Sequence, residues 1–425
     1  MKKKVIAISL ACAVIGTSLI GCSGSGQSSN SGNATPASGD SGKAVTLNYY
    51  TWYQSSDGSY PNNMITAFEK KYPNIKVNLE VGSQNVDEYL ETQKVKLLSG
   101  KDVDVTSVRA ESYKNYVNAG YLMDLTGESY LKNFNDDYVK QITVDGKMYG
   151  IPYAMDAYGC VYNKTMFDKN GWKVPGSYEE FQALCKKIAA TGIIPTVQGY
   201  KDSWPLAQDI ELFMNPVIVA DPTIYSKIDS GKAKYTDKEF VDAVTRMNDF
   251  FHSTAVTKQN MALTYDQSAA YFASGKAAMI MHGEWIMDSI KSAKPDFEIG
   301  VCPAPLNKQG TPQRGVVAIT STQCIAKNSQ HPKEAKLFEE YMASVDGASL
   351  MDQGLGNFTP VNGVQSKKKD LWKNVLNLPF TDFCTDYMYT GVSSEMYKSA
   401  QKMISGDITP AQMCQAMQSA QDKKG

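Results

Sequence analysis

The stretch DGKMYGIPYAMDAYGCVYNKTMF, residues 145–167, decides how the chain is organised. It opens with Asp145-Gly146, a tight-turn signal between two short runs that could pair as the strands of a hairpin. Pro152 has no N–H to give to a neighbouring strand, so we expect an extended segment outside the sheet after it. A new apolar run, 158–162, then starts a second strand.

A segment that leaves one sheet and promptly enters another is what a crossover between two lobes requires. Its middle carries Tyr153, Asp156 and Tyr158, whose side chains could face a ligand held between the lobes. A surface hairpin followed by an ordinary strand fits these residues equally well. The stretch alone does not separate the two interpretations.

The size and charge of the chain limit the classes of function. At 425 residues the chain exceeds the length at which a single hydrophobic core stops growing, which favours two domains. Its 43 basic and 44 acidic residues form no basic stripe, which argues against a nucleic-acid partner. Several of its 25 Tyr and 5 Trp stand in polar, Gly-containing segments, as expected for a surface that binds a molecule with apolar faces and many hydroxyls. Most of the tyrosines could equally cover ordinary surface.

The N-terminus reads as an export signal. Three lysines, 2–4, precede an apolar run over 5–20, and Leu19-Ile20-Gly21-Cys22 follows. This sequence resembles the lipobox of bacterial lipoproteins, in which cleavage precedes the Cys and its thiol is acylated. We therefore expect a signal peptide over 1–21, lipidation of Cys22 at the outer face of a bacterial membrane, and a flexible Ser/Gly tether over 22–43. An uncleaved membrane anchor is the alternative.

The other cysteines are expected to be mostly buried thiols, because they are widely spaced in apolar runs. A bridge between Cys302 and Cys324 is the one pairing considered. No CxxC motif or Cys/His cluster indicates a metal site.

The first part of the chain alternates strands and helices. Apolar runs at 45–52, 75–81 and 103–108 predict strands, and helical patterns follow each of them. This order predicts an α/β lobe whose strand ends carry ligand-facing loops. Those loops would present Trp52, Tyr53, Gln54, Asp57, Arg109 and Glu111.

Later candidates also stand at the ends of predicted elements. Trp204 ends a polar loop over 200–205, where core packing has no evident need of an aromatic residue. The turn His282-Gly283-Glu284-Trp285 joins a strand to a helix and offers backbone donors beside the flat face of Trp285. Trp285 could instead pack its helix onto the sheet. Two further loops hold Arg314 and Asn357.

Recognisable catalytic patterns are missing. The three His stand in neither HxH nor HExxH spacing, and no GxSxG, P-loop or GxGxxG occurs. We therefore expect no catalytic residues, no metal and no cofactor. A glycosidase would need only two carboxylates about 5–9.5 Å apart, a separation that a sequence does not reveal.

Several segments, taken in order, resemble the extracellular solute-binding proteins of bacterial ABC sugar importers, the maltose-binding-like family. They are AFEKKYPNIKVNLE (67–80), DVTSVRAESYKNYVNAGYLMDLT (104–126), DGKMYGIPY followed by YNKTMFDKNGW, YFASGKAAMIMHGEW (271–285), IAKNSQHPKEAKLFEEYM (325–342) and GNFTPVN (356–362). Each is loose alone, but their common order and spacing carry the resemblance over nearly all of the chain after the tether.

The resemblance implies an α/β, two-lobed, periplasmic-binding-protein-like fold with hinge segments and a ligand cleft between the lobes. It implies lobe 1 over 44–154 plus 301–327 and lobe 2 over 155–300 plus 328–425. It also implies a receptor that binds a carbohydrate, with an oligosaccharide as the expected ligand, and delivers it to the transmembrane subunits of an ABC permease. The lipobox makes this receptor membrane-anchored, and the tether and the lack of exposed heptads favour a monomer. An exported carbohydrate-active enzyme and a receptor of the same fold feeding a sensor kinase are the alternatives.

Particular residues match positions of the family. Glu111 and Asp156 match family carboxylates, Trp285 matches an aromatic residue that stacks on a sugar ring, and 203–206 matches a segment near a second aromatic contact. The chain departs from the maltose binders at Lys201, where they hold an aromatic residue, and it has no clear Trp at their last stacking site. Tyr387 or Tyr389 would have to substitute there, so maltose is not the expected ligand.

Overall fold

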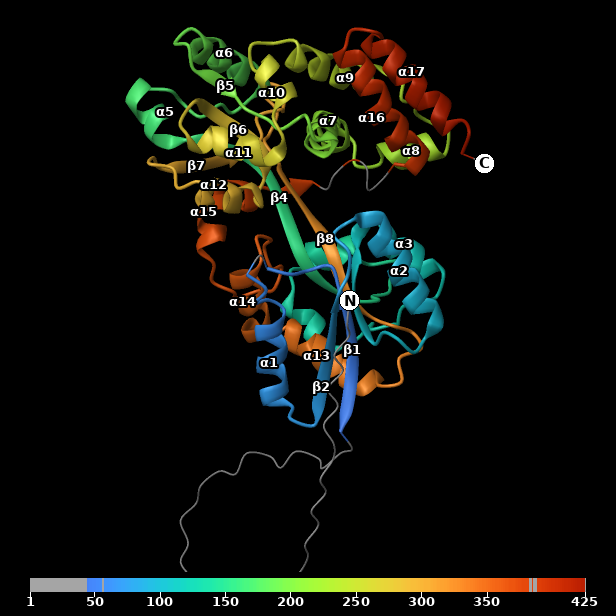
Figure 1. Ribbon diagram of the computed structural model, residues 1–425. Helices are drawn as coiled ribbons and strands as arrows, with labels where there is room; N and C mark the ends of the chain where they lie inside the picture. The colour runs from blue at the N-terminus through green and yellow to red at the C-terminus, as the bar shows by residue number, and fades with distance from the viewer. Residues whose placement is uncertain (1–43, 56, 382–383, 385–387, 425) are drawn as a thin grey trace, which may run out of the picture. The chain divides into compact units, whose positions relative to one another are not determined.

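Two long antiparallel strands, β4 (Ile151–Asn163) and β8 (Gly315–Ile325), run from one group of helices to another in the computed structural model (Figure 1). The structure describes residues 44–55, 57–381, 384 and 388–424, and leaves out the side chains of 87, 111, 203, 380 and 390. The predicted signal peptide, Cys22, the whole tether and Tyr387 lie outside the described residues. Residues 43–425 form one compact unit.

One mixed sheet runs through this unit. Its main path follows the order β2-β1-β3-β8-β4-β6-β5, β7 pairs with β4, and β9 pairs with β8. The pairs β1·β2 and β1·β3 are parallel, whereas β8 is antiparallel to both β3 and β4. The shorter strands are β1 (Val45–Thr51), β2 (Ile75–Val81), β3 (Val105–Arg109), β5 (Ile194–Thr196), β6 (Ala277–Gly283), β7 (Ile299–Pro303) and β9 (Phe380–Thr381).

The helices gather in two groups that we call lobes (Figure 1). The first lobe holds β1–β3 and the helices α1 (Asn62–Lys71), α2 (Val86–Ser99), α3 (Ala110–Asn118), η1 (Ser129–Asn133), α4 (Asp136–Gln141), α13 (Pro332–Met342) and α14 (Val345–Gly354). The second lobe holds β5–β7, β9 and the helices α5 (Lys164–Asn170), α6 (Tyr178–Ala189), α7 (Ser203–Ala220), α8 (Ile224–Asp229), α9 (Lys238–Phe251), α10 (Lys258–Ala262), α11 (Tyr265–Ala273), α12 (Ile286–Ser292), α15 (Lys367–Leu376), α16 (Thr390–Ile404) and α17 (Pro410–Gln421).

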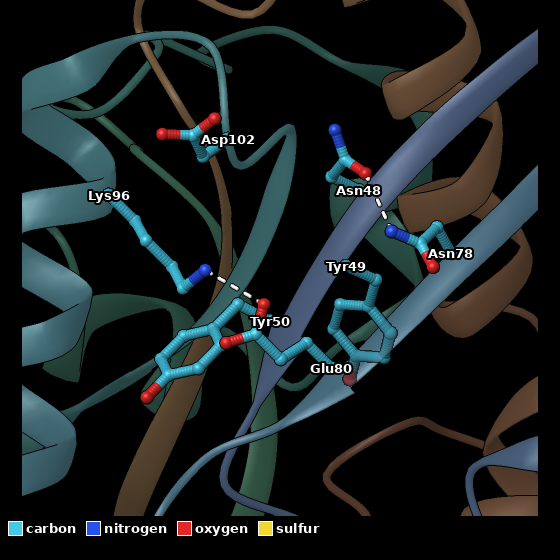
Figure 2. A pocket seen from close by; sticks show the side chains of 7 residues that line it. All are labelled: Asn48, Tyr49, Tyr50, Asn78, Glu80, Lys96 and Asp102. Carbon is cyan, nitrogen blue, oxygen red and sulfur yellow. Dashed lines mark hydrogen bonds and ion pairs between the residues drawn. The ribbon is translucent and has the colours of Figure 1, made fainter.

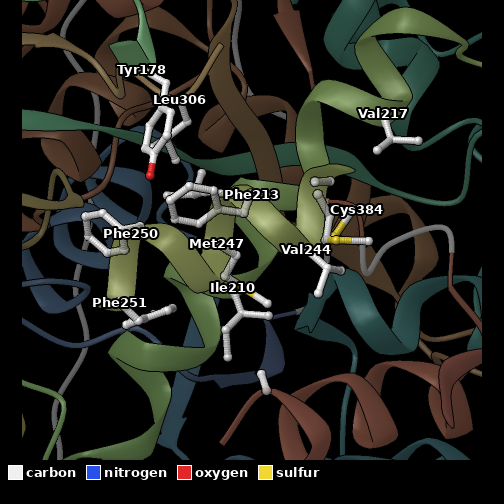
Figure 3. Packing of buried hydrophobic residues seen from close by; sticks show 14 of the residues in the cluster. Tyr178, Ile210, Phe213, Val217, Val244, Met247, Phe250, Phe251, Leu306 and Cys384 are labelled. Carbon is white, nitrogen blue, oxygen red and sulfur yellow. The ribbon is translucent and has the colours of Figure 1, made fainter. Parts of the chain in front are cut away.

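Each lobe has an apolar cluster of its own. In the second lobe α7 and α9 face each other, and the rings of Phe213 and Phe250 lie 5.2 Å apart (Figure 3). In the first lobe Phe68 of α1 and Phe338 of α13 pack over β1 with ring centroids 4.8 Å apart. A third cluster, which includes Met155 and Trp372, draws residues from both lobes. The predicted α/β architecture is confirmed.

The crossover differs from the expected one in a single respect. The prediction of a non-sheet segment after Pro152 is wrong, because β4 is continuous from Ile151 to Asn163. Pro152 stands opposite Thr322 of β8, where the register shifts on both sides of Ala154. This irregularity lets a residue without an N–H remain in the strand.

The predicted hairpin is reduced to its turn. Asp145 and Gly146 have φ values of 50° and 74°, and Val144 and Lys147 exchange both backbone hydrogen bonds around them. The residues before this turn form helix α4 rather than a strand. The turn chemistry was therefore predicted correctly, and the length of the pairing was not.

The packing of three elements suggests lobe limits that differ from those expected from the sequence. Helices α13 and α14 were expected in lobe 2, but α13 packs on β1, with Tyr49 and Phe338 ring centroids 5.4 Å apart. Strand β7, expected partly in lobe 1, pairs with the second-lobe end of β4. We propose that the first lobe includes α13 and α14, and that β7 belongs to the second.

The described cysteines are all buried and none of them forms a disulfide, as the sequence predicts. Cys302 on β7 lies beside Cys160 on β4, and its thiol donates to the Cys160 carbonyl oxygen. The Cys302–Cys324 bridge does not form.

Candidate ligand-binding site

Three aromatic residues of the second lobe, Trp204, Tyr265 and Trp285, stand at the beginnings of helices and form what we call the aromatic group. Trp204 and Tyr265 stand in the first turns of α7 and α11, and Trp285 is the residue before α12. The Trp204 ring lies 5.0 Å from Tyr265, 5.1 Å from His282 and 6.4 Å from Trp285. Trp204 is 40% exposed and the other two are partly exposed, so the group offers aromatic surface to solvent.

The buried ring of His282 packs against all three side chains of this group. The ring lies 5.3 Å from that of Trp285, and Gly283 N–H donates to its Nδ1. Burial lowers the pKa of His282 to about 3, so the ring stays neutral and acts as a flat packing surface. Gly283 is required here because a Cβ atom would lie 2.0 Å from the Trp285 ring.

A carboxylate stands beside the point where the lobes are joined. Asp156 lies in the middle of β4, and Asn357 Nδ2 donates to its Oδ1 at 2.5 Å. Its side chain is partly exposed, yet desolvation raises its pKa, against the opposing effects of the Asn357 hydrogen bond and the Arg109 charge. Asp156 is therefore held in place by a neighbouring side chain and remains partly exposed.

Glu284 lies behind Asp156 as a buried acid. Its Oε2 accepts from Ala157 N–H at 2.8 Å, and its Oε1 has no hydrogen-bond partner among the described residues. Burial first, and then the charge of Asp156, raise the pKa of Glu284 well above its usual range. Its surroundings therefore favour the protonated, neutral form.

Two first-lobe residues, Arg109 and Tyr53, interact electrostatically with Asp156. The Arg109 guanidinium lies 4.8 Å from the centre of the Trp52 ring, a cation–π contact. Tyr53 is buried with its ring 5.6 Å from that of Tyr153, and burial together with the charge of Asp156 raises its pKa. Both lobes thus contribute aromatic and charged groups around the same carboxylate.

Four predicted residues are not part of this arrangement. Tyr158 points into the second-lobe core, where its Oη donates to Asp209 Oδ1 at 2.5 Å, because α7 covers that part of β4. Asp57 closes its own exposed loop by accepting from Ser59 N–H at 2.9 Å, which helps to hold its pKa at about 2. Gln54 is exposed, and Arg314 lines a different pocket.

The prediction for Glu111 has no structural counterpart, since its side chain lies outside the described part of the structure. Trp204 was expected in a loop, but it stands in the first turn of α7. Tyr265, His282 and the hydroxyl of Thr320, which lowers the pKa of Asp156, were not among the predicted residues. Trp204 and Tyr265 share one feature, an aromatic side chain in the first turn of a helix. A search for this feature in the sequence would have identified Tyr265.

One other cavity has none of these site residues in its lining. The pocket in Figure 2, of about 250 Å³, lies against β1, β2 and α2, and its Lys96 is paired with Glu80 at 2.8 Å. Asn78 Nδ2 likewise donates to Asn48 Oδ1 at 3.0 Å.

Within the described ranges, no group of His, Cys, Asp and Glu could hold a metal ion. The helices in those ranges also include none that combines the length and apolar character needed to cross a membrane.

Comparison with known proteins identifies the family. Residues 52–349 match the model of the bacterial extracellular solute-binding proteins. The chain belongs to this family. The solute-binding protein described here is also 27% identical over 358 residues to the multiple sugar-binding protein of Streptococcus mutans, covering 82% of this chain and 83% of the relative.

Solved structures agree with the fold of this solute-binding protein. The binding protein MsmE of Bacillus subtilis, in an open conformation, superposes with a TM-score of 0.77 at 18% identity, covering 90% of this chain and 98% of that one. RafE in complex with raffinose superposes with a TM-score of 0.71 at 26% identity, covering 88% and 98%. The two-lobed fold predicted from the sequence is that of family 1 solute-binding proteins.

Proposed function

We propose that this protein is an extracytoplasmic receptor for a carbohydrate, most simply an oligosaccharide. The observation that carries the proposal is the aromatic group of Trp204, Tyr265 and Trp285 on the second lobe, together with Asp156 at the junction of the lobes. A pyranose has an apolar C–H face that stacks on aromatic rings and a hydroxyl edge that bonds to carboxylates and amides. The sugars in the names of the Streptococcus relative and the RafE complex support this choice.

The receptor would deliver its ligand to the transmembrane subunits of an ABC permease. Trp52 and Arg109 of the first lobe and Trp204 and Trp285 of the second can contact one ligand only when the lobes close on it. A ligand bound by both lobes favours the closed form, because it has higher affinity for that form. The permease would then respond to closure. No catalytic step is part of this proposal.

Thermal unfolding of residues 43–425 with a panel of mono- and oligosaccharides tests the proposal. A ligand present at a hundredfold its Kd adds about 2.7 kcal/mol of stability, which raises the melting temperature measurably. We expect one glycan class to give the shift, and chromatography of the incubated glycan to show no product. Product formation would support the enzyme alternative, and no shift with any glycan would contradict the receptor.

We further propose that Cys22 carries the lipid anchor and that the protein acts as a monomer at the outer face of the cell membrane. The export signal and Ser/Gly segment in the sequence support this arrangement. Cys22→Ala should move the protein from the membrane fraction to the soluble fraction, whereas Cys12→Ala should not. Light scattering of the sugar-bound protein would report a dimer if the monomer proposal is wrong.

A further inference from the structure

The second lobe contains a pocket of about 440 Å³ that none of the sugar-site residues line. We call it the lateral pocket, and it is formed by α7, α9 and the connection between β7 and β8. We propose that the lateral pocket is a second binding site, for a small carboxylate with an apolar body. The volume is in the range of small-molecule sites.

The lateral pocket is distant from the aromatic group. Trp204 stands in the first turn of α7, while Asn215 and Pro216 of the pocket stand near its other end. Eleven residues of helix correspond to about 16 Å along the axis. A ligand in the lateral pocket and a sugar on Trp204 would therefore not touch each other.

A buried amide without a partner marks the pocket. Asn215 is only 4% exposed, and neither Oδ1 nor Nδ2 has a hydrogen-bond partner among the described residues. Arg246 also lines the pocket, and its Nε is buried without a partner in the same part of the chain. Unpaired buried donors and acceptors destabilise a fold, so two of them lining one cavity indicate groups that a ligand satisfies.

The backbone of α7 is interrupted at the same place. Pro216 lies inside the helix and cannot donate a hydrogen bond to the carbonyl of Leu212, one turn earlier. Both residues line the lateral pocket. The helix therefore has one backbone hydrogen bond fewer in the turn that lines the pocket.

The remaining lining selects the chemical class. Pro216, Val217, Leu306 and Val316 supply an apolar wall, and Val217 and Leu306 are among the side chains in Figure 3. Arg246, Lys308 and Arg314 are the cations that line the pocket, against Glu239 and Asp242. Asp242 is paired with Lys238 at 2.6 Å, and the charges of Arg246 and Lys308 also help to lower its pKa. The three cations outnumber the two carboxylates by one, which favours an anion, and a pocket lined by a guanidinium and an amide suits a carboxylate with an apolar body.

Titration calorimetry with 1-naphthoate tests the inference, using the full chain in lipid nanodiscs and empty nanodiscs as the blank. We expect 1-naphthoate to bind, and the neutral naphthalene-1-methanol to bind at least tenfold more weakly. Arg246→Met should weaken naphthoate binding at least tenfold, and the exposed Arg314→Met should weaken it severalfold even if Arg246→Met does not fold. Equal affinity for the two probes would overturn the proposal.

Two controls separate this site from the sugar site. Asn215→Leu should lose naphthoate affinity yet raise the melting temperature of the unliganded protein by a few degrees, because an unpaired buried amide is removed. A lowered melting temperature would mean that the Asn215 amide is structural and would overturn its role. Trp285→Ala should leave naphthoate binding unchanged. Loss of naphthoate binding in Trp285→Ala would place the probe in the sugar site instead.

Discussion

Asn357 donates a hydrogen bond of 2.5 Å to Asp156 and so connects two of the chain segments that pass between the lobes. Asp156 belongs to β4, and Asn357 belongs to the connection between α14 and α15. Next to this bond, Met155 and Phe358 exchange both of their backbone hydrogen bonds at 2.9 Å. The carboxylate that we place in the sugar site is therefore also part of the joint about which the lobes would move.

Asn357→Leu should weaken sugar binding at least tenfold and lower the melting temperature slightly. The substitution removes the donor that orients Asp156, and hydrogen bonds to charged groups contribute about 1.5–3 kcal/mol. Calorimetry with the sugar found in the panel measures the affinity. Asn362→Leu is the control, since Asn362 is exposed and its backbone N–H, which the substitution keeps, donates to the Asn133 carbonyl oxygen. Equal affinities would remove Asn357 from the site.

Local signals were sufficient for most elements of the fold. Pro332 stands at the first position of α13, and Gly100 in the left-handed conformation closes α2, so residues at these helix ends carry the local signal. Pro152 misled because the rule against Pro in strands is local, whereas the irregular pairing that accommodates it depends on β8, far along the chain. Tertiary context decided that element.

Trp204 and Trp285 could be proposed for the site from the sequence, because each is an aromatic residue in a polar loop or turn where the core has no evident need of one. The site was not predictable where the covering element is distant in sequence. Tyr158 follows Asp156 on the same face of β4, but α7 buries it through Asp209. Arg314 was assigned from its loop, and only the folded chain places it in the lateral pocket.

Asp209 should make the stability of the protein depend on pH. It is buried, accepts from Tyr158 and Tyr200, and desolvation raises its pKa from 3.8 to about 7. A raised carboxyl pKa means that the folded state holds a proton that the unfolded state has lost. Stability contributed by this proton is therefore full below pH 4, falls between pH 4 and 7, and amounts to about 4 kcal/mol over that range.

Urea unfolding of the wild type and Asp209→Asn at pH 4, 5.5, 7 and 8 measures this effect. At each pH, the difference between the free energies of unfolding of the wild type and the variant gives the contribution of Asp209. Other acids with raised pKa values, such as Glu284, contribute equally to both proteins and cancel. We expect the variant to lose the dependence that Asp209 causes, while Asp249→Asn, at an exposed position, retains it. A constant difference across the pH series would show that Asp209 does not titrate in this range.

Trp285→Ala should weaken sugar binding by more than about 1 kcal/mol, roughly fivefold or more in Kd, because an aromatic face for stacking is lost. Trp172→Ala is the matched control. Trp172 is also partly exposed, but its ring packs on Phe167 at 5.7 Å in a different part of the second lobe. Unchanged affinity in Trp285→Ala would exclude this ring from the sugar site, whatever the effect of Trp172→Ala on stability.

Gly283→Ala tests whether the position of the Trp285 ring, rather than its presence, determines affinity. The added Cβ would lie 2.0 Å from Trp285 Cζ3, so the ring must move. Because stacking depends on geometry, we expect a loss of affinity close to that of Trp285→Ala, together with a shift in tryptophan emission. Gly176→Ala should change neither, since the nearest atom to its added Cβ, Glu180 Oε2, lies at 3.5 Å. If Gly283→Ala shifts the emission but binds the sugar normally, the ring tolerates displacement, and Trp204 and Tyr265 must supply the stacking surface.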